Sequence, residues 1–241
     1  MRIPENHWLK TTPIAHRGLW GEGIAENSLS AYKMAVECGF AIEIDVWASK
    51  DGVLFSFHDG FLKRMTGKDG HICEYESSYI NSLKLVGTDE KIPTLREVLF
   101  AVNGKVPLLI EIKNQPDKQI VERVLEELDE YQGEFAIQSF NPLYINKVKK
   151  IAPHVIRGIL GTADATGEKW LVRKIVKNLS LNFMIKPDFI AMRYNDLPLK
   201  KSKTKNKIVL AWTVTDQDIW DNVKAHANNL IFENFIPNGY L

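Results

Sequence analysis

The alternation of short apolar runs with longer amphipathic segments is the feature that most constrains how this chain can fold. Such alternation predicts repeated βα units arranged around a parallel sheet. The expected strands are residues 13–16, 41–46, 106–113, 134–140, 155–160, 188–192, 208–214 and 229–232. A further short strand is expected over 53–58, because it follows Asp51-Gly52, a strong turn dipeptide.

Helical spacing of apolar residues connects these strands. Helices are expected over residues 28–38, 94–102, 117–131, 142–151, 168–182 and 216–227. Eight strands with intervening helices predict an α/β chain closed as a (β/α)8 TIM barrel, and about 250 residues is the usual size of one such domain. We therefore predict a single domain over residues 1–241. The alternative, a doubly wound open sheet, lacks its glycine-rich turn, since Gly21 and Gly23 have no third glycine.

Residues 59–91 do not fit the alternation. Structureless connections of this length are uncommon in compact domains, so the segment is predicted to be a functional loop or a small insertion.

The overall charge gives no reason to expect a nucleic acid or an anionic membrane as a partner. The chain has 31 basic and 30 acidic residues and a net charge of +1. No apolar run resembles a signal peptide or a membrane span, so we expect a cytoplasmic protein without stable membrane insertion. Cys38 and Cys73 lie in no metal-binding or disulfide pattern and are expected to be structural thiols.

Charged residues occur on strands that should be almost purely apolar. Glu43 and Asp45 are two residues apart and share one face of their strand, and Glu111 and Lys113 repeat this arrangement. Their apolar neighbours would pack outward on helices. The charged side chains would then point into the barrel near the carboxyl ends of the strands, where such barrels carry their active sites.

Three converging carboxylates repel one another unless a cation is bound or their pKa values rise. An all-oxygen set of Glu43, Asp45 and Glu111 favours one divalent cation, Mg²⁺ or Ca²⁺, with Mn²⁺ also compatible. The alternative is a set of buried salt bridges that joins Glu111 to Lys113, and Glu43 or Asp45 to Arg17. With a divalent cation, Lys113 and Arg17 present, the site would carry one net positive charge, which a phosphodiester monoanion would neutralise.

Two histidines are expected at the same rim. His16 ends the first strand and His58 ends the short strand over 53–58. Cleavage of a phosphodiester needs one proton removed from the nucleophile and one delivered to the leaving alkoxide. Imidazole suits both tasks, because its unperturbed pKa near 6.5 lets one ring be neutral and another protonated at working pH.

These residues belong to motifs that resemble the glycerophosphodiester phosphodiesterase family over almost the whole chain. The motifs are AHRG (15–18), ENS (26–28), EIDV (43–46), DGVLFSFHD (51–59), LKRMTG (62–67), IPTLREVL (92–99), LLIEIK (108–113), QSF (138–140) and WTV (212–214). The family is a (β/α)8 barrel with an insertion after the second strand. One departure is Glu233-Asn234, where members usually have Thr-Asp, and it bears on the preference for the substrate head group.

The resemblance implies roles for individual residues. His16 and His58 would be the acid/base pair. The sequence leaves open which of the two is the base, and our own expectation is His16 as acid and His58 as base. Glu43, Asp45 and Glu111 would hold the metal. The expected substrate-binding residues are Arg17, Lys113, Gln138, Trp212, Glu26 and Asn27, with structural support of the first loop as the alternative for Glu26 and Asn27.

The predicted reaction is metal-dependent hydrolysis of a small-molecule glycerophosphodiester to sn-glycerol 3-phosphate and an alcohol. A second possibility is a lipid phosphodiesterase of the lysophospholipase D or sphingomyelinase D type, which would need an apolar surface on the insertion. A third is a non-catalytic barrel that binds a phosphoester. The sequence leaves open the leaving alcohol, the identity of the metal, which histidine is the acid, the attacking group and the oligomeric state.

Overall fold

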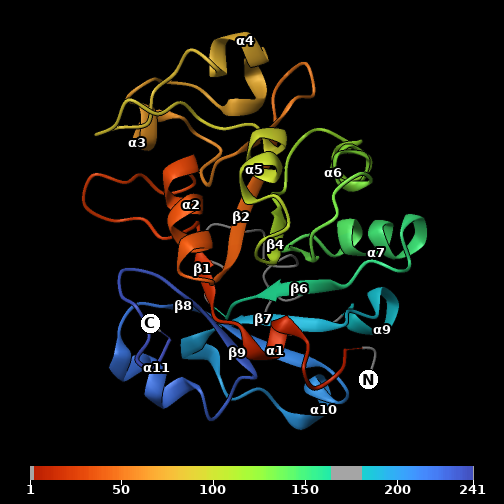
Figure 1. Ribbon diagram of the computed structural model, residues 1–241. Helices are drawn as coiled ribbons and strands as arrows, with labels where there is room; N and C mark the ends of the chain where they lie inside the picture. The colour runs from red at the N-terminus through yellow and green to blue at the C-terminus, as the bar shows by residue number, and fades with distance from the viewer. Residues whose placement is uncertain (1–2, 164–180, 241) are drawn as a thin grey trace. The chain divides into compact units, whose positions relative to one another are not determined.

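The computed structural model describes residues 3–163 and 181–240. Within these residues, eight parallel strands form an α/β TIM barrel, as predicted (Figure 1). The strand order in the sheet is β1-β9-β8-β7-β6-β5-β4-β2-β3, and β1 also pairs with β2. The parallel strands are β1 (Ile14–His16), β2 (Ala41–Ala48), β4 (Leu108–Ile112), β5 (Phe135–Ser139), β6 (Arg157–Gly161), β7 (Phe189–Arg193), β8 (Ile208–Val214) and β9 (Asn229–Phe232).

The predicted helices that fall within the described residues are present. The principal ones are α2 (Leu29–Glu37), α5 (Leu95–Val102), α6 (Ile120–Leu128), α7 (Pro142–Ile151) and α11 (Gln217–Val223). The single-turn helices α1 (Trp8–Thr11), α9 (Asn182–Ile185) and α10 (Lys201–Thr204) are among those that were not expected. The helix expected over 168–182 lies mostly in residues 164–180, outside the described part of the chain.

Residues 15–135 form one compact unit, which contains β2 and β4. The turn at Asp51-Gly52 leads into β3 (Leu54–Ser56), which pairs antiparallel with β2, so the predicted extra strand is present but shorter. Local sequence sets where the helices begin. The Ser28 hydroxyl accepts a hydrogen bond from the Ala31 amide at the start of α2, and Thr94 and Glu97 form a capping box at the start of α5.

The predicted insertion lies in the same unit and contains α3 (Lys63–Thr66), the 3-10 turn η1 (Ile72–Glu74) and α4 (Ser77–Ile80). Figure 1 shows α3 and α4 at the top of the picture. The segment has a small apolar core of its own, which includes Leu62, Ile72, Ile80, Leu83 and Leu85 packed with Trp47 and Phe57. Burial of these side chains is what holds a region with so little regular structure in place.

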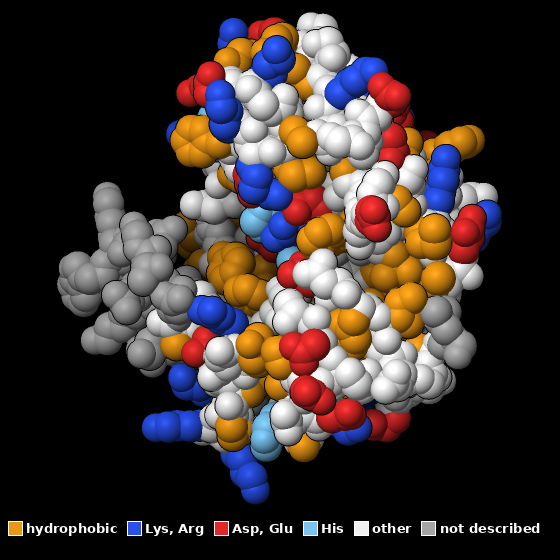
Figure 2. All heavy atoms as spheres, turned by 90° about the vertical axis from the view of Figure 1, so that its left-hand side faces the viewer, with side chains coloured by type: hydrophobic (Ala, Val, Ile, Leu, Met, Phe, Trp, Pro, Cys, Tyr) orange, Lys and Arg blue, Asp and Glu red, His pale blue; other side chains and the backbone are white. Residues whose placement is uncertain are grey.

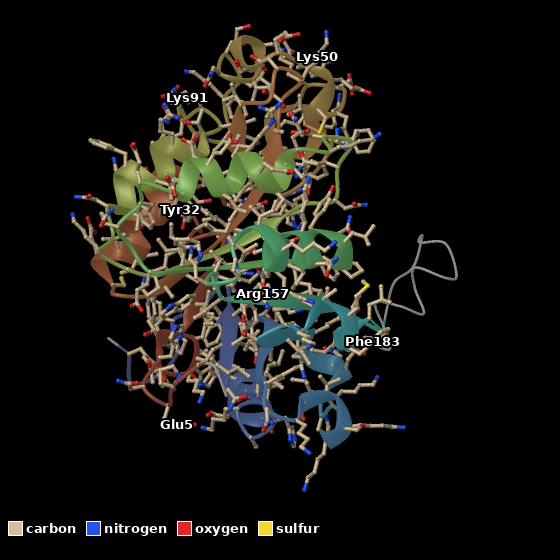
Figure 3. All side chains as sticks on the ribbon, turned by 90° about the vertical axis from the view of Figure 1, so that its right-hand side faces the viewer. Glu5, Tyr32, Lys50, Lys91, Arg157 and Phe183 are labelled. Atoms are coloured by element: carbon tan, nitrogen blue, oxygen red, sulfur yellow. The ribbon has the colours of Figure 1, made fainter. Side chains whose placement is uncertain are left out.

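The second compact unit comprises residues 1–14 and 136–241. Strands β6, β7, β8 and β9 are parallel neighbours in it. Arg157 on β6 is buried, and its guanidinium lies 3.7 Å from the Asp188 carboxylate (Figure 3). Phe183 on α9 is 77% exposed.

The surface carries mixed charge. Figure 2 shows basic and acidic side chains interspersed over one face, as the near-zero net charge implies. Among the described residues, no helix has the length and apolar character that crossing a membrane requires.

Candidate active site

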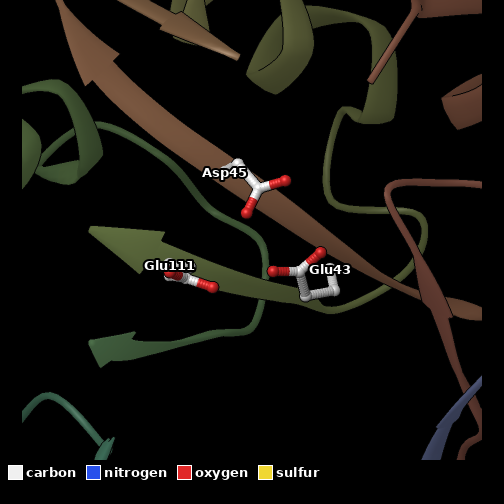
Figure 4. Close-up of side chains that lie close together, drawn as sticks. All are labelled: Glu43, Asp45 and Glu111. Carbon is white, nitrogen blue, oxygen red and sulfur yellow. The ribbon is translucent and has the colours of Figure 1, made fainter. Parts of the chain in front are cut away.

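Three buried carboxylates converge between β2 and β4. Strand register brings them together, because Asp45 pairs with Glu111 across the two parallel strands and Glu43 projects from the same face of β2 as Asp45. One oxygen from each carboxylate lies within 4.8 Å of the others (Figure 4). Among the described residues this is the group that could hold a metal ion, and its ligands are all oxygen atoms, as hard divalent cations prefer.

Two cations lie against this cluster. The Lys113 ammonium is 2.7 Å from Asp45 Oδ1 and 2.9 Å from Glu111 Oε1. The Arg17 guanidinium approaches Asp45 Oδ2 at 3.6 Å, and the Arg17 amide donates to Glu43 Oε2 at 3.3 Å. The salt bridges considered as the alternative are thus present. They leave three carboxylates facing two cations, a deficit that a further cation would correct.

The electrostatics differ between the two carboxylates of β2. Burial, followed by the charges of Asp45 and Glu111, raises the pKa of Glu43 well above its ordinary value. Burial also opposes ionisation of Asp45, but Lys113, then His58 and Arg17, outweigh it and lower the Asp45 pKa. Protein cations therefore neutralise Asp45, whereas for Glu43 the charges of Lys113 and Arg17 do not outweigh burial and the neighbouring carboxylates. This imbalance fits a cation site better than a closed set of salt bridges.

His16 is the last residue of β1, as predicted. Its Nε2 lies 4.0 Å from Glu43 Oε2, and its side chain is 14% exposed. The His16 carbonyl accepts a hydrogen bond from Trp20 Nε1 at 3.0 Å. The imidazole therefore lies directly beside the carboxylate cluster.

His58 comes two residues after the end of β3, not at its end as predicted. Its carbonyl accepts a hydrogen bond from Trp47 Nε1 at 3.1 Å, and its Nδ1 lies 2.7 Å from Asp59 Oδ1. The hydrogen bond with His58, followed by those from Arg64, keeps the pKa of Asp59 well below its ordinary value. An ionised carboxylate only accepts hydrogen bonds, so Nδ1 carries the ring proton and a neutral His58 has a bare Nε2.

Glu26 and Asn27 contact protein groups beside the carboxylates. Glu26 Oε1 accepts from Arg17 Nη1 at 3.0 Å, and Asn27 Nδ2 donates to Asp45 Oδ2 at 3.0 Å. The Tyr32 hydroxyl lies 2.7 Å from Asn27 Oδ1 and 2.6 Å from the Ser56 hydroxyl. Both residues therefore contact other side chains of the site, and their substrate-binding role stays a prediction.

The remaining predicted substrate-binding residues, Gln138 and Trp212, belong to the second compact unit. Gln138 lies buried on β5, and its Oε1 has no hydrogen-bond partner among the described residues. Trp212 lies on β8 with its ring edge-on to Phe140, and its buried Nε1 likewise lacks a partner within the described chain. An unsatisfied buried donor and acceptor in one unit are features that a polar ligand would relieve.

Sequence reasoning assigned no role to four residues that support the site: Tyr32, Ser56, Asp59 and Arg64. Asp59 and Arg64 lie in the quoted motifs DGVLFSFHD and LKRMTG, which was the available signal. Tyr32 lies within the predicted helix 28–38, whose apolar spacing gives no sign of the hydrogen bonds that its hydroxyl makes.

Comparisons with known proteins show which family the chain is similar to. The sequence profile described as the Glycerophosphoryl diester phosphodiesterase family matches residues 16–236. A glycerophosphodiester phosphodiesterase of Caldanaerobacter subterraneus subsp. tengcongensis is 33% identical over 242 residues, which cover 92% of this chain and 94% of that protein. Human glycerophosphodiester phosphodiesterase 1 is 24% identical over 90% of this chain and 76% of its own length.

A solved structure of an Oleispira antarctica phosphodiesterase, in complex with the product sn-glycerol-3-phosphate, has the same fold. Its TM-score is 0.77 at 23% identity, over 92% of both chains.

Proposed function

The chain belongs to the glycerophosphoryl diester phosphodiesterase family and is a phosphoric diester hydrolase, and from that premise we propose that it cleaves glycerophosphodiesters to sn-glycerol 3-phosphate and an alcohol with the aid of one divalent cation. The observation that carries the proposal is the buried cluster of Glu43, Asp45 and Glu111 with His16 at its edge. The third possibility, a non-catalytic barrel, is set aside because the family is one of hydrolases and both histidines are present.

Glu43, Asp45 and Glu111 would hold the cation, Mg²⁺, Ca²⁺ or Mn²⁺. When bound, it would neutralise charge on the phosphate oxygens and orient the nucleophile. Two observations support this assignment. The donor atoms are all oxygens. The pKa of Glu43 is raised, mainly by burial and then by Asp45 and Glu111, and a bound cation would stabilise its ionised form.

The two histidines would move the protons. The bare Nε2 that a neutral His58 presents, fixed by the bond of Nδ1 to Asp59, suits the base that takes a proton from the nucleophile. His16 would then deliver a proton to the leaving alkoxide. Its neighbour Glu43 would stabilise the protonated imidazole.

Arg17 and Lys113 would bind the phosphate. Both cations lie at the carboxylate cluster, and their side chains are 14% and 12% exposed, so a bound anion would meet them with little intervening water. With two cationic side chains and a divalent ion against three carboxylates, the site would carry one positive charge and match a phosphodiester monoanion.

A second candidate, lysophospholipase D action, is favoured by one observation in the insertion. Phe61 is 67% exposed and Val86 is 58% exposed, whereas Leu62, next to Phe61 in the sequence, is fully buried. Comparing turnover of glycerophosphocholine with that of lysophosphatidylcholine separates the two activities. Faster turnover of the lipid would favour the second candidate.

The proposal is tested by measuring glycerol 3-phosphate released from a panel of glycerophosphodiesters by the wild type, His16→Ala and His58→Ala. General acid or base catalysis contributes about 10²- to 10⁴-fold, so each variant should lose at least about 100-fold in kcat. His226→Ala, at an exposed histidine after α11, is the matched control and should retain wild-type rates. Undiminished activity in either active-site variant would contradict the assigned mechanism.

A further inference from the structure

Arg64 of α3 lies between two carboxylates and contacts both with one guanidinium. Toward Asp59, Nε lies 2.6 Å from Oδ2 and Nη2 lies 3.1 Å from Oδ1. Toward Glu26, Nη1 lies 3.0 Å from Oε2 and Nη2 lies 2.6 Å from Oε1. All three guanidinium nitrogens are therefore engaged, in two paired contacts.

Each carboxylate connects Arg64 to a group of the proposed machinery. Asp59 Oδ1 is 2.7 Å from His58 Nδ1, which orients that imidazole. Glu26 Oε1 accepts from Arg17 Nη1 at 3.0 Å, and the Arg17 guanidinium continues to Asp45 at 3.6 Å. One side chain of the insertion thus joins the proposed base to the proposed phosphate ligand.

The chemistry of the contact requires arginine. A planar guanidinium offers donors in a fixed fork, so it can bind two carboxylates in pairs, whereas a lysine ammonium is a point charge that cannot reproduce both pairs. Glu26 is 7% exposed on its side chain and Asp59 is 26% exposed, so loss of the shared cation would leave two partly desolvated carboxylates with one partner each.

We propose that Arg64 is a positioning residue: by holding Asp59 and Glu26 together, it fixes the His58 imidazole and the Arg17 guanidinium in the relative places that hydrolysis requires. Arg64 itself contacts neither substrate nor metal in this assignment. The proposal rests on the proposed function for the roles of His58 and Arg17. Through Arg64, the insertion would contribute to the reaction as well as to the fold.

The kinetic test uses Arg64→Ala and Arg64→Lys with a glycerophosphodiester substrate. Residues that orient primary ligands typically contribute about 10- to 100-fold to activity, and we expect a loss of that size in kcat/KM for Arg64→Ala. Arg64→Lys should lie closer to Arg64→Ala than to the wild type. The matched control is Arg96→Ala, because Arg96 makes a similar paired contact with Glu127, at 2.7 and 3.2 Å, between α5 and α6.

Measuring kcat and KM separately for each variant distinguishes a positioning role of Arg64 from a purely structural one. Asp59→Asn should lower kcat through His58, Glu26→Gln should raise KM through Arg17, and Arg64→Ala should do both. Adding Arg64→Ala to the Asp59→Asn and Glu26→Gln double variant should then cost little more. A further loss of 10-fold in the triple variant would overturn the proposal.

A measurement that does not need turnover tests the role of Arg64 even if the proposed function fails. In ¹⁵N-edited NMR spectra, the His58 Nδ1–H should give a slowly exchanging resonance in the wild type and lose that protection in folded Arg64→Ala. If the wild type hydrolyses no glycerophosphodiester, the proposed function fails while this spectrum still judges Arg64. An unchanged His58 resonance, or unchanged kcat and KM in Arg64→Ala, overturns the proposal.

Discussion

Replacing Glu43 by Gln distinguishes a cation site from a set of structural salt bridges. Glutamine keeps the shape and an acceptor for the Arg17 amide, which lies 3.3 Å from Glu43 Oε2. It removes a charge that faces two other carboxylates within 4.8 Å. At an effective dielectric constant of about 20, each such repulsion is worth about 3.5 kcal/mol.

Lys113 and Arg17 offset a large part of this repulsion, while burial of the charge adds to its cost. We therefore expect Glu43→Gln to raise the free energy of unfolding of the metal-free protein by about 1–3 kcal/mol. A salt-bridge role predicts the opposite sign, because breaking a buried ion pair costs about 3–5 kcal/mol. The two accounts thus differ by at least about 4 kcal/mol.

The assay is urea denaturation in EDTA and again with a saturating divalent cation. At a cation concentration of 100 Kd the wild type should gain about 2.7 kcal/mol, and Glu43→Gln should gain far less at the same concentration. The control is Asp188→Asn, which breaks the buried contact with Arg157 at 3.7 Å and should destabilise the protein in both conditions. A Glu43→Gln protein that is less stable than the wild type in EDTA by about 3 kcal/mol would refute the reasoning.

Two further predictions concern the same cluster. Because burial and the neighbouring carboxylates raise the pKa of Glu43, cation binding must release a proton below that raised pKa. Cation affinity measured by calorimetry should therefore rise with pH and then level off, with proton release detected by comparing buffers; an affinity that falls as pH rises would contradict this. Tyr32→Phe removes the hydroxyl that lies 2.7 Å from Asn27 Oδ1 and 2.6 Å from Ser56, so it should cost about 1–2 kcal/mol of unfolding free energy and weaken cation binding about 10-fold. Tyr79→Phe, at a 37% exposed position, should change neither, and equal effects of the two substitutions would rule out a specific role for the buried network.

The barrel could be predicted from the sequence because its signals are local. Strands 208–214 and 229–232 and helix 142–151 have the predicted bounds, since continuous apolar runs and a proline at a helix start mark them. The helix expected over 117–131 covers only Ile120–Leu128. The helix begins three residues later than predicted. The Asp117 carboxylate accepts a hydrogen bond from the Gln119 amide at 2.8 Å, and this local bond competes with helical hydrogen bonding.

The carboxylate cluster was predictable for a related reason. Two-residue spacing places Glu43 and Asp45 on one strand face, and a charge on a buried strand is informative in itself. The pairing of Asp45 with Glu111 depends on strand register, which no local pattern sets.

The contacts of Arg64 lay beyond sequence reasoning. Its bond to Glu26 spans 38 residues, and its position on a single-turn helix has no periodicity that would indicate a direction. Lys63 and Lys68 nearby offer the same charge, so composition could not single out Arg64. The three residues are distinguished by the folded insertion, in which Arg64 contacts both Asp59 and Glu26.

The most direct test of metal-dependent hydrolysis is a ³¹P NMR time course of glycerophosphocholine with the wild-type protein. With Mg²⁺, Ca²⁺ or Mn²⁺ present, we expect the diester resonance to be replaced by that of sn-glycerol 3-phosphate, and we expect conversion to stop when EDTA is added. Absence of the monoester with all three cations across the panel of glycerophosphodiesters, or undiminished conversion in EDTA, would contradict the account.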